Sequence, residues 1–257
     1  MATKYNDDIE AVKNINILKE ISVLRQFLEF NLNSSDQLFE KFKTLDNVVY
    51  RCNPEEEQER FLYNEGTREN KVLLVAHADT IWDKCFGYDP IDQRIEEEYG
   101  CYMGNNSEYG IGADSRAACA MLWFLRDMGH SILILDGSEC DRIGSKWLMD
   151  HHPDVVEKIN KHQFIIELNT TGDLFFKCSE SSSKDFIRYI VQKSEFEFSG
   201  DDTTTDLSVL CNVLPGVNFS IGYHFEHQEK EYVNIQQWSS TLQMLKKLLS
   251  EKELPRF

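Results

Sequence analysis

Four short apolar runs, separated by stretches with helical spacing, constrain the fold of this chain more than any other feature. They read VLLVA, SILIL, QFIIEL and VNFSI and lie at residues 72–76, 131–135, 163–168 and 217–221. Such continuous runs are typical of strands buried on both faces of a sheet. Strands that alternate with helices along a chain form mainly parallel, layered sheets. We therefore predict an α/β fold.

Apolar residues at helical spacing fill most of the segments between these strands. We predict two helices between Asn14 and Lys43, and later helices over Asp114–Met128, Arg142–Asn160, Lys184–Gln192 and Ile235–Leu249. VVYRC, RFLY and LFFKC predict further strands. Because the chain has no linker-like segment and no internal repeat, we predict one domain over residues 1–257, with an N-terminal helical elaboration over residues 1–50.

Composition excludes several classes of partner. Of the 257 residues, 41% are hydrophobic, which is enough for one substantial core. The net charge of −17 repels nucleic acid and anionic membranes, so neither is an expected partner. Seven cysteines without a C-x-x-C pair indicate reduced thiols rather than disulfides. With no apolar run of membrane-spanning length, we expect a soluble, cytoplasmic protein.

Polar and ionisable side chains follow each of the four predicted strands, where ligands bind in open α/β sheets. They are His77 and Asp79, then Asp136, Ser138 and Glu139, then Glu167 and Asn169, and finally His224, Glu226 and His227. Asp114 follows Gly110-Ile111-Gly112 and begins a predicted helix. Each group has an ordinary reading, since Asp114 can cap its helix and the segment through Glu231 can be a solvated loop. Together, imidazoles and carboxylates at one sheet edge are a ligand set that suits zinc.

Five segments resemble, in the same order, the metal-site segments of the co-catalytic zinc exopeptidases. They are VLLVAHADT, GIGADSRAACAML, LDGSECDRIGS, FIIELN and NFSIGYHFEHQEKEYVN, between Val72 and the C-terminal part of the chain. This superfamily includes zinc aminopeptidases, carboxypeptidases, deacylases and the single-zinc glutaminyl cyclases. The resemblance implies a three-layer αβα sandwich with a mixed, mainly parallel sheet. It also implies the catalytic domain alone, without an inserted lid or dimerisation domain.

The resemblance assigns roles to four positions. His77 matches the first metal ligand of the superfamily, and Asp79 matches the carboxylate that orients that ligand. Such a carboxylate fixes the tautomer of the imidazole and raises its basicity. Asp114 matches the carboxylate that bridges two metal ions, and His227 matches the final histidine ligand.

At two positions the chain departs from the superfamily pattern. Relatives carry two consecutive glutamates after LDG, the first as general base and the second as metal ligand. Here an alignment without gaps places Ser138 at the base position and Glu139 at the ligand position. An alternative, with Glu139 as base and Cys140 as ligand, requires an insertion. Asn169 stands where relatives carry an aspartate ligand.

These departures imply one zinc ion rather than two. Asp114, Glu139 and His227 form a full ligand set with an open position, as in catalytic zinc sites. The other half-site combines His77 and Asp114 with the uncharged Asn169, so its metal ion is expected to be weak or absent.

Three functions remain open at this level. The first is a zinc-dependent hydrolase that acts on an amide bond of a peptide or acylated amino acid. Its activity would be reduced, because serine cannot act as a general base. General acid–base catalysis contributes about 10²- to 10⁴-fold to the rate. The second is an inactive metal-binding pseudoenzyme that holds a peptide, a small molecule or a partner protein. The third, a scaffold without metal, is disfavoured by the nearly complete ligand set.

Other side chains could replace the missing base or line the substrate pocket. The candidate substitutes are Asp141, Glu167, His224 and Glu226, and the sequence does not distinguish among them. Thr203 to Asp206 resemble the superfamily segment that lines the substrate pocket. A helix cap at Asp206 explains that segment equally well.

Overall fold

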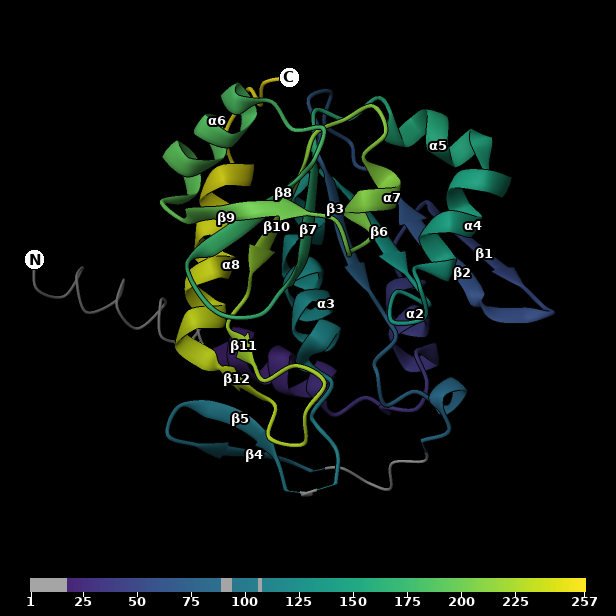
Figure 1. The fold of residues 1–257 in the computed structure, drawn as a ribbon, viewed down its shortest axis with the longest axis vertical. Helices are drawn as coiled ribbons and strands as arrows, with labels where there is room; N and C mark the ends of the chain where they lie inside the picture. Colours follow the sequence, from purple (N-terminus) through teal and green to yellow (C-terminus); the bar gives the residue numbers. More distant parts are fainter. Residues whose placement is uncertain (1–17, 89–93, 106–107) are drawn as a thin grey trace, which may run out of the picture.

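An eight-stranded sheet forms the middle layer of the protein (Figure 1). The computed structural model describes residues 18–88, 94–105 and 108–257. The strands lie in the order β1 (Val48–Asn53), β2 (Glu56–Asn64), β6 (Ser131–Leu135), β3 (Leu73–His77), β7 (Ile165–Thr170), β10 (Gly216–Ser220), β8 (Phe175–Ser179) and β9 (Glu197–Asp202). The central strands β6, β3, β7 and β10 are parallel, whereas β1, β2 and β8 bring antiparallel pairings. The predicted mixed, mainly parallel sheet is confirmed.

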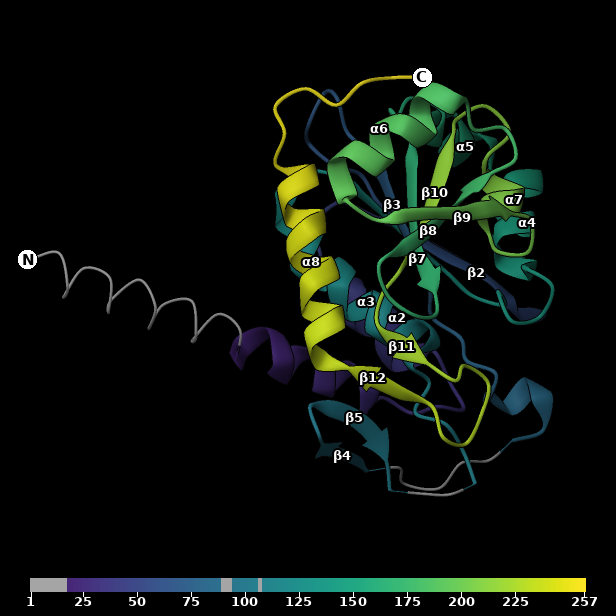
Figure 2. The ribbon, with the colours of Figure 1, turned by 60° about the vertical axis from the view of Figure 1, so that its left-hand side comes forward.

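Helices cover both faces of this sheet (Figure 2). One face carries helical residues 18–28, α2 (Asp36–Phe42), α3 (Ala113–Leu125), α6 (Lys184–Ser194) and α8 (Ile235–Leu249). The other face carries α4 (Ile143–His151), α5 (Pro153–Ile159) and α7 (Leu207–Leu210). Strand side chains alternate between the two cores, because successive residues of a strand face opposite sides. In β3, Leu74 and Ala76 enter one core, and Leu73 and Val75 the other.

A second, four-stranded antiparallel sheet lies beyond the carboxyl ends of the central strands, at the lower end in Figure 1. Its order is β11 (Tyr223–His224), β12 (Tyr232–Asn234), β5 (Cys101–Gly104) and β4 (Ile95–Glu98). No sequence pattern predicts this sheet, because its strands are short and β4 is largely acidic. The loop between β11 and β12 brings residues 225–231 to the edge where the central strands end.

Most predicted helices are found with small changes. The helix predicted over Arg142–Asn160 is two helices, because Pro153 lacks an amide hydrogen and begins α5 rather than continuing α4. The helix predicted from Asp114 is extended by a 3-10 turn to Met128 and ends at Gly129, whose φ is 78°. α8 has the predicted bounds and is capped by the Asn234 side chain.

The N-terminal segment also forms helices, and these belong to the core. Leu24, Phe27 and Phe42 pack in the same core as α3. The part of the predicted first helix before residue 18 lies outside the described residues, and β1 already begins at Val48. Within residues 18–88, 94–105 and 108–257, no helix is long and apolar enough to cross a membrane.

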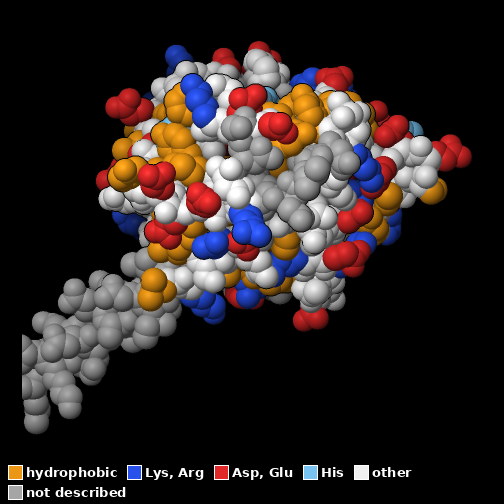
Figure 3. All heavy atoms as spheres, turned by 90° about the horizontal axis from the view of Figure 1, so that it is seen from below, with side chains coloured by type: hydrophobic (Ala, Val, Ile, Leu, Met, Phe, Trp, Pro, Cys, Tyr) orange, Lys and Arg blue, Asp and Glu red, His pale blue; other side chains and the backbone are white. Residues whose placement is uncertain are grey.

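Charged side chains of both signs are distributed over the end of the molecule that carries the small sheet. Figure 3 shows this end, with acidic and basic groups interspersed among hydrophobic ones. The acidic groups visible on this face are therefore scattered rather than gathered in one patch.

Candidate functional site

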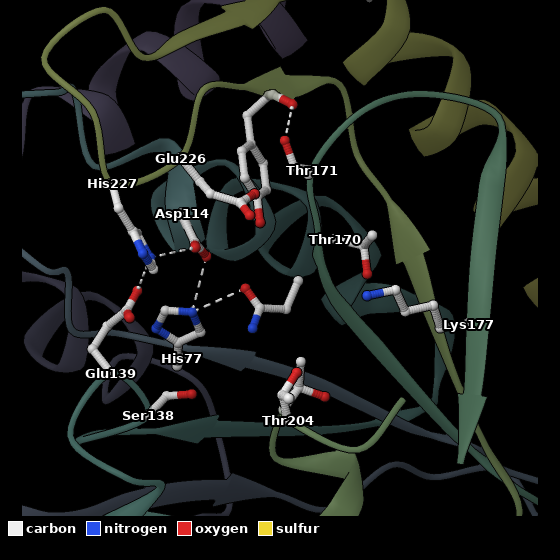
Figure 4. A pocket seen from close by; sticks show the side chains of 13 residues that line it. His77, Asp114, Ser138, Glu139, Thr170, Thr171, Lys177, Thr204, Glu226 and His227 are labelled. Atoms are coloured by element: carbon white, nitrogen blue, oxygen red, sulfur yellow. Dashed lines mark hydrogen bonds and ion pairs between the residues drawn. The ribbon is translucent and has the colours of Figure 1, made fainter. Parts of the chain in front are cut away.

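His77 lies at the end of β3, and both of its ring nitrogens face oxygen atoms. Nδ1 lies 3.2 Å from Asp79 Oδ1 and 3.1 Å from the Asp79 carbonyl oxygen. Nε2 lies 3.1 Å from Asp114 Oδ1 and 3.0 Å from Asn169 Oδ1 (Figure 4). A neutral imidazole carries one N–H, so it can satisfy acceptors at only one nitrogen. The other nitrogen requires a proton or a cation at this place.

The surroundings of His77 favour positive charge. Its ring is 1% exposed, and burial alone would disfavour the charged form. Hydrogen bonds to Asp114 and Asp79 outweigh that penalty and hold the pKa of His77 well above its usual value. A metal ion at Nε2 would meet the same demand.

Asp114 joins His77 to His227. Its Oδ1 contacts His77 Nε2, and its Oδ2 lies 3.3 Å from His227 Nε2. Although burial favours the neutral acid, hydrogen bonds from His227 and His77 lower the pKa of Asp114 to about 2. The backbone of Asp114 is not helical, with φ −80° and ψ 100°, and Gly112 precedes the helix instead. Both carboxylate oxygens of Asp114 contact imidazoles, so capping of the helix alone does not account for this side chain.

His227 and Glu139 complete the cluster. His227 comes from the loop between β11 and β12, and its Nε2 lies 2.9 Å from Glu139 Oε1. Hydrogen bonds to Asp114 and Glu139 raise the pKa of His227 to about 10. Burial raises the pKa of Glu139, and the bond to His227 opposes this effect.

Asp79 supports both ends of the cluster. It is fully buried; its Oδ1 faces His77, and its Oδ2 accepts a 2.9 Å hydrogen bond from the backbone N–H of Glu139. One carboxylate thus positions the strand-end histidine and the loop that carries Glu139. This is the orienting geometry expected for Asp79 from the resemblance.

The donor set fits a divalent transition metal. One ligand atom from each of His77, Asp114 and Glu139 lies within 4.8 Å of the others. The Nε2 atoms of His77 and His227 both face carboxylate oxygens of Asp114 or Glu139. Without their protons, these nitrogens and oxygens are all electron-pair donors around a common space, which suits a cation. Imidazole with carboxylate is a donor combination that zinc prefers.

Ser138 is held beside this cluster by a buried carboxylate. Its hydroxyl donates a 2.8 Å hydrogen bond to Asp206 Oδ2. Asp206 is fully buried, and burial raises its pKa. Asp206 precedes α7, yet its side chain makes no capping hydrogen bond and instead accepts from Ser138.

The four candidate substitutes for the base differ in position. Asp141 is exposed and pairs with Arg142 and Lys146. Glu167 is buried and accepts from Thr205, and His224 bonds to Gln237. Glu226 alone among the four lines the cavity next to the cluster, and burial raises its pKa.

The cavity has a volume of about 260 Å³. Its lining comprises His77, Asp114, Ser138, Glu139, Asn169, Thr170, Thr171, Lys177, Thr204, Thr205, Tyr223, Glu226 and His227. Six of the seven residues that the sequence singled out therefore border one space, and Asp79 lies behind it. Cys140, the ligand of the alternative alignment, does not line it.

Sequence reasoning missed several residues at the site, among them Thr170 and Thr171 of the cavity lining. Glu231 was expected in a solvated loop, but it is 2% exposed and accepts a 3.2 Å bond from the backbone N–H of Asp114. Burial raises the pKa of Glu231 to about 8. Tyr223 and Lys177 line the cavity. For Lys177 a signal existed, because it is the one charged residue inside the apolar run LFFKC.

Comparison with known proteins shows the fold but no sequence relative. No family model and no curated protein matches the sequence. Among solved structures, the aminopeptidase PepT from Bacillus cereus ATCC 10987 matches with a TM-score of 0.65 at 11% identity, over 91% of this chain and 98% of that one. The Pyrococcus horikoshii TET1 peptidase matches with a TM-score of 0.62 at 13% identity, over 90% and 99%.

A third match gives the same result. An aminopeptidase from the archaeon Desulfurococcus kamchatkensis has a TM-score of 0.61 at 10% identity, over 91% of this chain and 95% of that one. The fold is therefore that of these aminopeptidases and peptidases, in agreement with the fold that the resemblance implies. Identities this low establish the fold, and the chemistry must be argued from the residues of this chain.

Proposed function

We propose that this protein is a zinc-dependent amide hydrolase of the exopeptidase type, with reduced or altered activity. The substrate would be a peptide or an acylated amino acid. The observation that carries the proposal is the pair of Nε2 atoms, on His77 and His227, that face opposite oxygens of the same Asp114 carboxylate.

The ligands would divide into a strong and a weak set. Asp114, Glu139 and His227 would hold one zinc ion, with two carboxylates for charge neutralisation. His77 and Asn169 would complete a weaker second site, because an amide oxygen coordinates without charge. When bound, zinc supplies Lewis acidity for the scissile carbonyl and acidifies a water molecule.

Ser138 limits what the chain's own residues can do in such a reaction. Its hydroxyl donates its one hydrogen bond to Asp206. Towards the cavity, the Ser138 oxygen can therefore only accept a hydrogen bond. It can orient a water molecule but cannot take its proton near neutral pH. The missing base is worth about 10²- to 10⁴-fold in rate. Glu226 is the carboxylate in the cavity that is left outside the proposed ligand set.

A second function is supported by the same serine. A chain that keeps its ligands and lacks its base suits a metal-binding module that holds a peptide, a small molecule or a partner without cleaving it. The two functions share the metal site and differ only in turnover.

The test is to restore the base. Ser138→Glu is compared with wild type and with Ser138→Ala as a matched control, on aminoacyl and acyl-amide substrate panels with zinc present. Slow hydrolysis by wild type, increased in Ser138→Glu and not in Ser138→Ala, supports the hydrolase. An inert wild type that still binds zinc supports the binding module. Brisk wild-type turnover that is indifferent to residue 138 contradicts the assignment of the lost base.

Metal content tests the ligand assignment separately. Mass spectrometry after purification without chelators is expected to show about one zinc ion per chain, because a single half-site has its full set of charged ligands. Two zinc ions per chain would mean that Asn169 is a competent ligand. A chain without zinc would support the third function, a scaffold without metal.

A further inference from the structure

Residues 31–35, which we call the supporting segment, lie between helical residues 18–28 and α2. Four consecutive backbone carbonyls of this segment accept hydrogen bonds from the chain around the proposed metal site. They belong to Asn31, Leu32, Asn33 and Ser34. Arg116 Nη2 donates to the first and the last of them, at 2.7 and 3.0 Å. The Thr80 hydroxyl donates to the second at 2.9 Å, and the Lys84 backbone N–H to the third at 3.3 Å.

Two of these donors are close in sequence to residues of the site. Arg116 lies two residues after Asp114, and Thr80 directly follows Asp79. Both donors are fully buried. A buried carbonyl needs a hydrogen-bond partner, so these contacts leave the supporting segment little freedom to move. The segment thus joins the loop after β3 to the start of α3.

Ser35, the last residue of the supporting segment, reaches the loop of Glu139. Its Oγ donates a 2.8 Å hydrogen bond to Asp136 Oδ2, and Arg60 Nε donates to the same oxygen at 2.7 Å. Arg60 Nη2 also donates to Ser35 Oγ at 2.5 Å. Asp136 directly follows β6, and its Oδ1 accepts from the Gly137 backbone N–H at 3.2 Å. The chain from Asp136 to Glu139 is therefore held at its start by Ser35 and Arg60.

The charged pair within this network contributes geometry more than stability. The side chains of Arg60 and Asp136 are 6% and 3% exposed. The cost of removing two charges from water offsets much of their attraction, so an apolar pair of similar volume would stabilise the fold equally well. A fully hydrogen-bonded buried network, in contrast, holds its members in one arrangement. Its position beneath the loop of Glu139 makes that arrangement relevant to the site.

We propose that the supporting segment fixes the relative positions of the three loops around the proposed metal site, with Ser35 as a positioning residue for Glu139. Ser35 acts through Asp136 and does not touch the ligands itself. This inference rests on the proposed function for the identity of the bound ion. The segment lies outside the part of the chain that resembles the exopeptidases, which begins at Val72.

Three variants separate positioning from general stability. Ser35→Ala removes the hydroxyl, and Ser35→Thr keeps it. Ser194→Ala is the matched control, because Ser194 is also buried and its hydroxyl also donates one hydrogen bond and accepts one. Its partners are Ile190 and Phe196, in and after α6. Thermal unfolding shows that each variant is folded and how far its stability falls.

Hydrogen exchange tests the positioning in zinc-free protein. The Glu139 backbone N–H donates to Asp79 Oδ2, so its exchange rate, measured by NMR, reports on the loop. Ser35→Ala should accelerate this exchange by at least about tenfold through local opening and leave the amides of β10 unchanged. Ser35→Thr should restore slow exchange, and Ser194→Ala should not alter it at Glu139. An unchanged rate, equal acceleration in β10, or Ser35→Thr behaving like Ser35→Ala overturns the inference.

Zinc affinity tests the consequence for the metal ion. Competition with a chelator should show binding about tenfold weaker in Ser35→Ala, the lower end of the range for groups that support a metal ligand. Ser194→Ala should bind zinc like wild type. Equal affinity in wild type and Ser35→Ala overturns the inference. A wild type that binds no zinc contradicts the proposed function instead, and the exchange rates then decide whether Ser35 positions the loop.

Discussion

The two half-sites around Asp114 differ in rigidity and in charge. His77 stands at the end of a central strand, is fully enclosed, and has Asn169 as its second neighbour. His227 lies in a loop, its side chain is 43% exposed, and its second neighbour is Glu139. The Nε2 atom of the better-held histidine thus faces one carboxylate and an amide oxygen, whereas Nε2 of His227 faces two carboxylates. Position alone does not decide where a metal ion binds, because the ligand charges must also neutralise it.

The largest effect is expected from removing what the half-sites share. Asp114→Asn keeps the shape of the side chain but takes the charge from both. Groups that only support a metal ligand already contribute about 10- to 100-fold to affinity, so this loss should exceed about 100-fold. Zinc per chain, measured by mass spectrometry, should fall to near zero. The exposed Asp141→Asn should leave it unchanged.

The next test compares the two histidines directly. His227→Ala is expected to weaken zinc binding by about 100-fold, and His77→Ala by less than about tenfold, because His227 belongs to the half-site with two carboxylates. Competition titration with a zinc chelator gives both affinities. Thermal unfolding of each variant controls for the burial of His77. The reverse order would mean that rigidity outweighs charge.

Charge can also be added to the poorer half-site. Asn169→Asp should raise the zinc content from about one ion to about two, since a carboxylate replaces an uncharged oxygen beside His77. Metal analysis at increasing free zinc provides the measurement, and Asn212→Asp, at an exposed position outside the cavity, is the control. A content that stays near one ion would show that Asn169 does not limit the second site.

The smallest effect concerns pH in the zinc-free protein. His227 has a folded pKa of about 10 against an ordinary 6.5, so its protonated form stabilises the fold. That contribution is complete below about pH 6.5 and is lost as the pH rises towards 10. The difference in unfolding free energy between wild type and His227→Gln should therefore shrink over this range. Salt should reduce it further, since the ring is partly exposed. A difference independent of pH would contradict the proposed protonation.

The sequence predicts the centre of the fold well and its periphery poorly. Runs such as SILIL have one stable place, between two helical layers, so β6 and its parallel neighbours follow directly from pattern. β4 and β11 are short and acidic or aromatic, and they form strands only because neighbouring strands pair with them. Pro153 marks the break between α4 and α5, which helical spacing of apolar residues alone does not predict.

The same division holds for the site. His77 and Glu139 follow buried strands, so the rule about strand ends identifies them without any relative. His227 also follows a predicted strand, but only the resemblance distinguishes it from His224 and Glu226 in the same segment. Glu231 looked solvated in the run HQEKE, yet the close approach of Asp114 encloses it. Which member of a charged run becomes buried depends on contacts that no local pattern contains.

Asp79 gives the cluster a property that neither half-site has alone. Its two oxygens reach His77 on one side and the loop of Glu139 on the other. Together with Asp114 it closes a ring of contacts through both halves, so a shift of either histidine is transmitted to the opposite ligands. Occupancy of one position should therefore set the geometry of the other, and binding of two ions would be cooperative rather than independent.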